Sequence, residues 1–248
     1  MRVVGIVAMR MGSHRLPGKS LIDIAGQPLL AHLLNRLKAC SNLDEVVVAT
    51  TSLDEDKPII DYARSFGVGL FRGSSHDVLE RITQAAKEYK ADICVVVYGD
   101  GPLIDPEIVD FAVDSFQANS ELDFLGNDLK TTFPSGMEVE VVRFDALLRS
   151  HELCSDSATR EHGTLFLRQH PELFNVENFE AQGSWRRPDL FFEVDEEDDL
   201  PVVEAIAAFL KENNSYALDE IIRFADENNL SRVNSAVNRR YQQFRTSE

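Results

Sequence analysis

Short apolar runs alternate with segments of helical periodicity through the first half of the chain, and this alternation constrains the fold most strongly. The strand-like runs cover residues 2–7, 45–50, 68–73, 92–100 and 122–127. Between them, apolar residues recur at helical spacing in 29–37, 54–67, 74–89 and 105–117. Because strand–helix–strand units place their strands in parallel, and strands buried on both faces are continuously apolar, we predict an α/β fold with a mostly parallel, doubly wound sheet.

The pattern changes in the second half. Residues 137–144 alternate in part and a mixed strand-like run covers 173–181, so we predict that 130–185 form an inserted segment with antiparallel strands and a homodimer contact. The run 189–195 predicts another buried strand, and 196–212 predicts a helix with an acidic start. We expect a single domain over residues 1–248, in which 215–248 form a C-terminal helical tail.

Composition excludes several classes of function. A net charge of −17 argues against a nucleic-acid partner, because such binding requires Lys and Arg to neutralise phosphates. No run of about 18 apolar residues is present, so we expect no membrane span, and no signal peptide is recognisable at the N-terminus. Cys40, Cys94 and Cys154 lie far apart without a CxxC motif, which favours reduced thiols and a cytoplasmic location.

The loop at 8–21 ends in Gly-Lys-Ser, as a phosphate-binding P-loop does, but it differs from one in two ways. Five residues rather than four separate Gly12 from Gly18. A P-loop lysine also begins a helix whose N-terminus faces the phosphates, whereas Gly26 and Pro28 interrupt any helix soon after Lys19. We therefore predict an irregular loop at the carboxyl end of the first strand, where open α/β sheets bind ligands.

The same loop has the residue types of an anion site. Residues 1–22 contain four basic residues and no Asp or Glu. Arg10, Arg15 and Lys19 can grip the phosphates of a nucleoside triphosphate, and Gly12 and Ser13 allow close approach of the backbone. The alternative is a solvated basic loop with an ordinary Pro-Gly turn.

Two aspartates end buried runs of the predicted sheet. Asp100 precedes Gly101-Pro102, and Asp195 precedes four further acids at a predicted helix start. If the strands are parallel, both carboxylates lie at the same edge as the basic loop, where they can hold the Mg²⁺ that accompanies a triphosphate. For Asp195, an N-cap of the following helix is an equally good interpretation.

Seven stretches spread along nearly the whole chain carry a resemblance to a known family: AMRMGSHRLPGKSLIDIAGQPLL, VVVATT, FRGSSHDVLER, GDGPLID, PSGMEVEVV, TREHGTLFL and FFEVDEEDDL. In combination they resemble the cytidylyltransferases that activate acidic sugars, such as the CMP-Kdo and CMP-acylneuraminate synthetases. The resemblance is strongest to the branch of spore-coat polysaccharide biosynthesis protein F.

This resemblance implies a Rossmann-like nucleotidyltransferase fold and a homodimer. It also implies transfer of CMP from CTP to an acidic sugar, with Mg²⁺ as cofactor and release of pyrophosphate, for surface polysaccharide biosynthesis. The implied catalytic residues are Arg15, Lys19 and Asp100, and the implied metal ligands are Asp100 and Asp195. The implied nucleotide-binding residues are Ala8, Arg10, Gly12, Ser13, Arg15, Lys19, Arg72, Asp77 and Arg81. The implied acceptor-binding residues are Glu138, Glu140, Arg160 and His162.

Structural roles compete with several of these assignments. Asp77 can cap its own helix and pair with Arg81 at i+4, and the pair Arg160 and His162 can be an ordinary surface feature. The chain also departs from the family pattern at Val97-Tyr98, Met137-Glu138 and Gly163.

Because these departures fall on the acceptor side, the identity of the acceptor stays open. One alternative is a nucleotidyltransferase that uses another nucleoside triphosphate or a small phosphorylated or phosphonylated acceptor. Another is a non-catalytic sugar-nucleotide-binding homologue.

Overall fold

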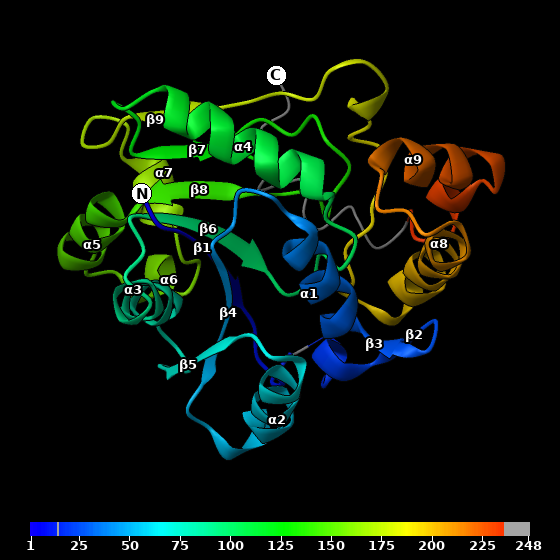
Figure 1. Ribbon diagram of the computed structural model, residues 1–248, viewed down its shortest axis with the longest axis horizontal. Coiled ribbons are helices and arrows are strands. Elements are labelled where there is room, and N and C mark those ends of the chain that lie inside the picture. The colour runs from blue at the N-terminus through cyan, green and yellow to red at the C-terminus, as the bar shows by residue number, and fades with distance from the viewer. Residues whose placement is uncertain (14, 236–248) are drawn as a thin grey trace.

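The computed structural model describes residues 1–13 and 15–235, and its framework is a seven-stranded sheet in the order β5-β4-β1-β6-β8-β7-β9 (Figure 1). All pairings within it are parallel except those of β8 with its two neighbours. The α/β fold with a mostly parallel, doubly wound sheet is confirmed. The strands are β1 Val3–Ala8, β4 Glu45–Thr51, β5 Gly69–Gly73, β6 Ile93–Tyr98, β7 Phe124–Gly126, β8 Glu140–Arg143 and β9 Val176–Asn178.

Helices cover both faces of the sheet (Figure 1). On one face, α1, α2, α4, α8 and α9 share a core with alternate strand residues such as Val7 and Val95. On the other, α3, α5 and α7 pack against residues such as Ile6 and Val96. The helices are α1 Leu29–Ala39, α2 Lys57–Phe66, α3 Val78–Glu88, α4 Pro106–Ala118, α5 Phe144–Leu153, α6 Ser157–Arg160, α7 Leu165–Gln169, α8 Leu200–Asn213 and α9 Leu218–Glu227.

The register of the central strands creates the edge on which a site can be built. Ala8, the last residue of β1, lies opposite Ala49 on β4 and Tyr98 on β6. The loops that follow these three strands therefore leave the sheet side by side. A 3-10 turn at Lys19–Leu21 and a small hairpin of β2 Asp23–Ile24 and β3 Gln27–Pro28 then lead into α1.

Residues 130–185 are built differently from the expectation. Strand β8 is antiparallel but lies inside the main sheet between β6 and β7, and β9 is parallel to β7. The predicted antiparallel pairing is present in β8, which lies inside the main sheet rather than in a separate group of strands, and the bounds of an inserted segment stay a prediction. Val141 and Val142 of β8 point into the two opposite cores, which explains why this strand reads as only partly alternating. The homodimer contact stays a prediction.

The predicted buried strand at 189–195 is also wrong. Its only pairing in the described chain is an isolated bridge between Phe191 and Ser135. Phe192 and Val194 are nevertheless buried in the core, so packing without strand pairing explains the apolar run. In the tail, α9 and a 3-10 turn at Leu230–Arg232 are present, and the predicted helical continuation over 236–248 lies outside the described residues.

Candidate active site

The basic loop after β1 is held by a buried carboxylate. The backbone N–H of Met11 donates to Asp56 Oδ1 at 2.6 Å. Asp56 Oδ2 accepts from the hydroxyl of Thr50 and from the backbone N–H and hydroxyl of Thr51, at the end of β4. Asp56 is fully buried. Since the loop N–H and the β4 end share one carboxylate, the start of the loop is fixed relative to the sheet edge.

Turns within the loop fix its shape. Gly18 N–H donates to Met11 O at 3.0 Å, and the φ of +75° at Gly18 suits glycine. The Ser13 hydroxyl accepts from the Leu16 N–H at 3.3 Å. An ideal Cβ on Gly12 would lie 2.9 Å from Glu55 Oε1, so the absence of a side chain lets the backbone approach that carboxylate.

The structure brings the basic loop and both aspartates together. Lys19 Nζ lies 3.0 Å from Asp195 Oδ1 and 3.6 Å from Asp100 Oδ2, and it also donates to Val194 O at 2.8 Å. Arg15 Nη2 donates to the same Asp195 oxygen at 2.7 Å. The chain around Asp195 is tied to the β6 end, because Val194 N–H donates to Asp100 O at 2.8 Å. Arg15 and Lys19 thus lie beside Asp100 and Asp195, although these residues are far apart in the sequence.

The N-cap interpretation of Asp195 does not hold. Glu196 and Asp199 form the capping box at this helix start, and Asp199 accepts the N–H of Asp195. The Asp195 carboxylate faces Lys19 and Arg15 instead.

Burial and charge oppose each other in this cluster. Burial alone would lower the pKa of the Lys19 ammonium, but Asp100 and Asp195 outweigh it and raise the pKa above its ordinary value. Burial and the nearby Asp100 charge raise the pKa of Asp195, although Lys19 and Arg15 counteract them. A further positive charge at the two carboxylates would therefore favour the ionised form of Asp195.

The two carboxylates also fit what Mg²⁺ requires from a protein. Within residues 1–13 and 15–235, no group of three or more His, Cys, Asp or Glu side chains is placed to hold a metal ion. Magnesium, however, is commonly held by one or two carboxylates together with substrate phosphates. Asp100 and Asp195 meet that requirement because both face the same ammonium group.

The segment before α3 meets the loop through Arg10. Arg10 Nη1 donates to Ser75 O at 2.8 Å, and Nη2 lies 3.7 Å from Glu161. Arg81 is buried and donates to Ser74 O at 2.6 Å, and burial lowers the pKa of its guanidinium. Arg81 thus shapes the turn that Arg10 contacts. Arg72, by contrast, is exposed and donates to Ser52 O at 2.8 Å.

Asp77 does cap its helix, since its Oδ1 accepts the Glu80 N–H at 2.8 Å. Its other oxygen pairs with Arg160 Nε at 2.6 Å rather than with Arg81. The remaining Arg160 nitrogens are also engaged within the chain, by His151 and by the Cys154 carbonyl. The structure therefore gives Arg160 a bracing role between α3 and α6.

The other acceptor-side residues lie in different surroundings. Glu138 accepts the Gly136 N–H at 2.6 Å, in the turn that packs against Gly101. His162 is exposed. Glu140 is 2% exposed and accepts from Thr164 at 2.8 Å and from Arg168 at 3.2 Å.

Glu140 belongs to a buried polar cluster at the sheet edge. Arg168 pairs with Asp128 at 2.8 Å as well as with Glu140, and the Tyr98 hydroxyl lies 3.4 Å from Glu140. Burial, followed by the charge of Asp128, raises the pKa of Glu140 to about 7 even though Arg168 and Thr164 oppose the shift. The cluster lies next to Tyr98, at the end of β6.

Two departures from the family pattern are structurally linked. An ideal Cβ on Gly163 would lie 2.7 Å from the Tyr98 hydroxyl, and Gly163 has a φ of +58°. Tyr98 in turn donates to the His162 carbonyl at 3.3 Å. A tyrosine at 98 therefore requires the small residue at 163.

Sequence reasoning missed Asp56, Asp128 and Arg168. Asp56 looks like an ordinary acid before a helix, and only its burial shows that it anchors the loop. Arg168 and Asp128 are separated by 40 residues, so no local spacing could have paired them.

Comparison with known proteins assigns this chain to a family. The profile of a family described as cytidylyltransferase matches residues 4–231, which is most of the chain. The chain belongs to the cytidylyltransferase family. A cytidylyltransferase from Leptospira borgpetersenii has a similar structure, with a TM-score of 0.87, 32% identity, and 93% of this chain and 96% of that chain covered.

Two curated relatives of this cytidylyltransferase carry informative names. The spore coat polysaccharide biosynthesis protein SpsF of Bacillus subtilis is 28% identical over 91% of this chain and 95% of its own length. The 3-deoxy-manno-octulosonate cytidylyltransferase of Trichlorobacter lovleyi is 35% identical over 49% of this chain and 48% of its own length. The cytidylyltransferase therefore has relatives named for polysaccharide biosynthesis and for a sugar-acid reaction.

Proposed function

We propose that this cytidylyltransferase transfers CMP from CTP to an acidic sugar, of the Kdo or nonulosonic-acid type, and releases pyrophosphate. The observation that carries the proposal is the convergence of Lys19 with Asp100 and Asp195, beside Arg15. A scaffold that only bound a sugar nucleotide would not require these cations and carboxylates at one point, which disfavours the non-catalytic alternative.

In this reaction an acceptor hydroxyl oxygen forms a bond to the α-phosphorus of CTP. The bond from that phosphorus to the bridging oxygen of the β-phosphate breaks, pyrophosphate departs, and the hydroxyl proton is lost to water. The protein contributes positioning and neutralisation of charge rather than a covalent step. Arg15 and Lys19 stabilise the negative charge that develops on the leaving pyrophosphate, and Arg10 adds a cation on the nucleotide side of the loop.

We assign Mg²⁺ to Asp100 and Asp195. When bound, it supplies Lewis-acid polarisation of the phosphate oxygens. Asp195 would then hold the ion instead of Arg15 and Lys19, and these two side chains would contact the triphosphate.

The acidic acceptor is proposed from the relative named for 3-deoxy-manno-octulosonate. Of the four residues assigned to the acceptor, Glu140 and Arg160 are engaged within the chain, whereas His162 is exposed beside them. We therefore assign direct acceptor contact to His162, with Tyr98 and Glu140 behind it, whereas Glu138 accepts the Gly136 N–H and its contact with the acceptor stays a prediction. A different nucleotide or a small phosphorylated acceptor is the alternative.

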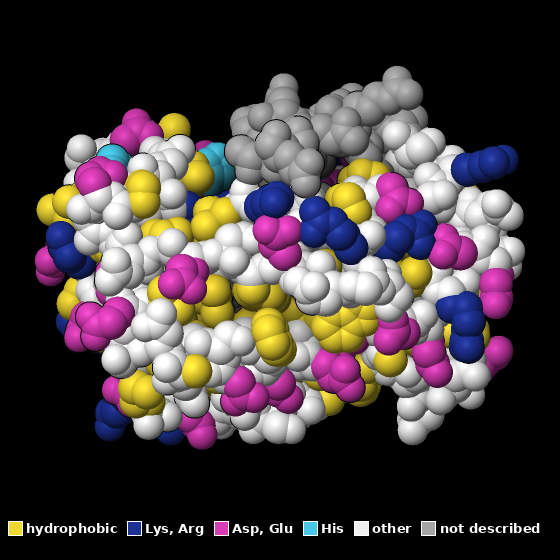
Figure 2. Space-filling view, turned by 90° about the horizontal axis from the view of Figure 1, so that it is seen from above, with side chains coloured by type: hydrophobic (Ala, Val, Ile, Leu, Met, Phe, Trp, Pro, Cys, Tyr) yellow, Lys and Arg dark blue, Asp and Glu magenta, His cyan; other side chains and the backbone are white. Residues whose placement is uncertain are grey.

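We also propose a homodimer in the cytoplasm. Figure 2 shows apolar side chains gathered in the middle of the face that carries α4 and β9. Phe111 on α4 is 54% exposed and contacts Phe179 edge-on, with ring centroids 5.6 Å apart. Light scattering that gives the mass of two chains supports the dimer, and the mass of one chain refutes it.

No helix in the described chain is long and apolar enough to cross a membrane.

The function is tested by measuring pyrophosphate release with CTP, Mg²⁺ and a panel of acidic sugars. Parallel reactions with ATP, GTP and UTP identify the nucleotide, and reactions with phosphorylated and phosphonylated acceptors test the alternative. Release that requires CTP, Mg²⁺ and one acidic sugar supports the proposal. Release only with another nucleotide or acceptor class would refute the assignment.

A further inference from the structure

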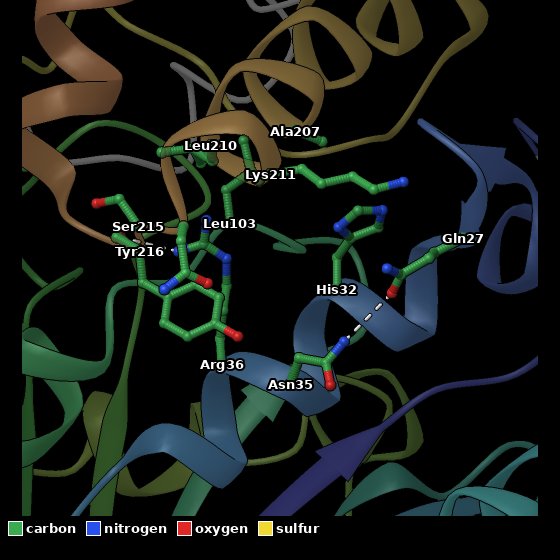
Figure 3. Close-up of a pocket in the computed structure, with 11 residues that line it drawn as sticks. Gln27, His32, Asn35, Arg36, Leu103, Ala207, Leu210, Lys211, Ser215 and Tyr216 are labelled. Atoms are coloured by element: carbon green, nitrogen blue, oxygen red, sulfur yellow. Dashed lines mark hydrogen bonds between the residues drawn. The ribbon is translucent and has the colours of Figure 1, made fainter.

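A cavity lies between α1 and the corner that joins α8 to α9, and no residue of the basic loop lines it (Figure 3). Its volume is about 210 Å³. It shares no lining residue with the cluster of Lys19, Asp100 and Asp195. The polar side chains that line it include Gln27, His32, Asn35, Arg36, Lys211 and Tyr216.

The charge of this cavity is opposite to that of the chain. The chain carries 42 acidic and 25 basic residues, yet none of the described side chains that line the cavity is acidic, whereas Arg36 and Lys211 do line it. A cationic lining on such an acidic protein attracts anions locally, because charges at contact distance outweigh distant ones that solvent screens.

Arg36 is the buried cation of the cavity. It is 3% exposed, and its Nη1 donates to Ile104 O at 3.2 Å and to Tyr216 O at 2.9 Å. The guanidinium carbon lies 5.0 Å from the centroid of the Tyr216 ring. Burial lowers the pKa of Arg36 to about 10, so the group remains charged at neutral pH.

No carboxylate among the described residues lies within 4 Å of the Arg36 guanidinium, in contrast to Arg15, Arg160 and Arg168. A buried charge is ordinarily compensated by an opposite charge. The charge of the buried Asp105 acts on Arg36 from beyond that distance and favours its ionised form, so Arg36 keeps a positive charge and fixed donor geometry beside the cavity.

The other lining groups add hydrogen-bonding capacity around Arg36. His32 Nε2 bonds the Ile24 carbonyl at 2.7 Å, and burial lowers the pKa of the ring, so in the neutral form Nε2 is the donor and Nδ1 is an acceptor. Asn35 donates to Gln27 Oε1 at 3.3 Å (Figure 3). Lys211 Nζ bonds the Ala25 carbonyl at 3.3 Å. Acceptors and donors beside cations suit a ligand that carries hydroxyl groups as well as an anionic group.

We propose that this cavity binds a small hydroxylated oxyanion, either a phosphate monoester or a carboxylate, with Arg36 and Lys211 on the anionic group. The occupant would touch two segments that lead to the active site. Leu103 in the lining lies three residues after Asp100, and Gln27 lies shortly after the turn that contains Lys19. The proposal rests on the cavity and does not depend on the reaction.

The test is a titration of the isotope-labelled chain, followed residue by residue through its amide NMR signals. The probes are glycerol 2-phosphate, inorganic phosphate and glycerate. Saturable shifts in residues 27–36 and 207–216 are expected at lower concentration than any shift in the basic loop. A response to the phosphates alone or to glycerate alone identifies the anionic group. The absence of saturable shifts in these two segments for all probes would overturn the proposal.

Lys211→Gln tests the role of Lys211 in binding. Because Lys211 is exposed, its replacement should leave the fold intact. We expect binding in the cavity to weaken roughly 10-fold, as for the loss of one charge-assisted hydrogen bond. The control is Lys38→Gln, which also removes one positive charge. Lys38 lies on α1, contacts Phe66 and does not line the cavity. Equal affinities in the two variants would contradict the assignment of Lys211.

Discussion

Replacing Glu140 by glutamine should change how the stability of the fold depends on pH. Glu140 has an ordinary pKa of 4.5 in the unfolded chain, and burial beside Asp128 raises it to about 7 in the folded one. Between these values the folded state holds a proton that the unfolded state has released. The free energy of unfolding therefore falls as the pH rises through this range. The total change is about 3 kcal/mol, from roughly 1.4 kcal/mol for each pH unit.

Urea unfolding of the wild-type protein and of Glu140→Gln, from about pH 5 to about pH 8, measures the contribution of Glu140 to the free energy of unfolding. About 2 kcal/mol of the total change falls inside this pH range. This pH range lies above the isoelectric point of about 4.7, so the chain carries a net negative charge throughout the measurement. The wild-type protein should lose stability relative to Glu140→Gln as the pH rises. Glu177→Gln, which removes an exposed carboxylate on β9, should keep the wild-type slope. A constant stability difference between the wild type and Glu140→Gln across the window would refute the reasoning.

Two further substitutions test the architecture around the site. Gly163→Ala should cost about 1–3 kcal/mol because it places a Cβ at a φ of +58° and 2.7 Å from the Tyr98 hydroxyl; in a Tyr98→Phe background part of the cost should disappear in unfolding measurements, and an identical cost would contradict the coupling. Asp56→Asn removes an oxygen that accepts hydrogen bonds at the β4 end, and should lower the free energy of unfolding by about 1–3 kcal/mol and weaken CTP binding in calorimetry. Unchanged CTP affinity would show that the loop is held elsewhere.

The parts of the fold that sequence reasoning predicted are those with a local signal. Strands β1, β4 and β6 are continuously apolar because helices cover both faces, and α1 shows its apolar spacing directly. The convergence of Lys19 with Asp100 could be expected from strand order alone, since parallel strands share a carboxyl edge. Even where 189–195 proved not to be a sheet strand, the backbone bond from Val194 to Asp100 kept Asp195 at that edge.

What could not be predicted depends on pairings between distant residues. The place of β8 inside the sheet is set by its neighbours β6 and β7, and the sequence of β8 itself does not encode it. Arg160 carries the residue type of an anion site, but its partner Asp77 comes from another helix start and gives it a bracing role. Likewise, the need for a residue without a side chain at position 163 becomes visible only in the structure, where the Tyr98 hydroxyl lies against Gly163.

The account depends most on the claim that the basic loop and the two aspartates form one nucleotide site. Calorimetric titration of CTP in the presence and absence of Mg²⁺ tests this claim directly with Lys19→Ala, Asp100→Asn and the control Lys38→Ala. We predict that Lys19→Ala weakens CTP binding roughly 10–100-fold, that Asp100→Asn removes the Mg²⁺ dependence, and that Lys38→Ala binds as the wild type does. Wild-type affinity in Lys19→Ala, or an undiminished Mg²⁺ effect in Asp100→Asn, would contradict it.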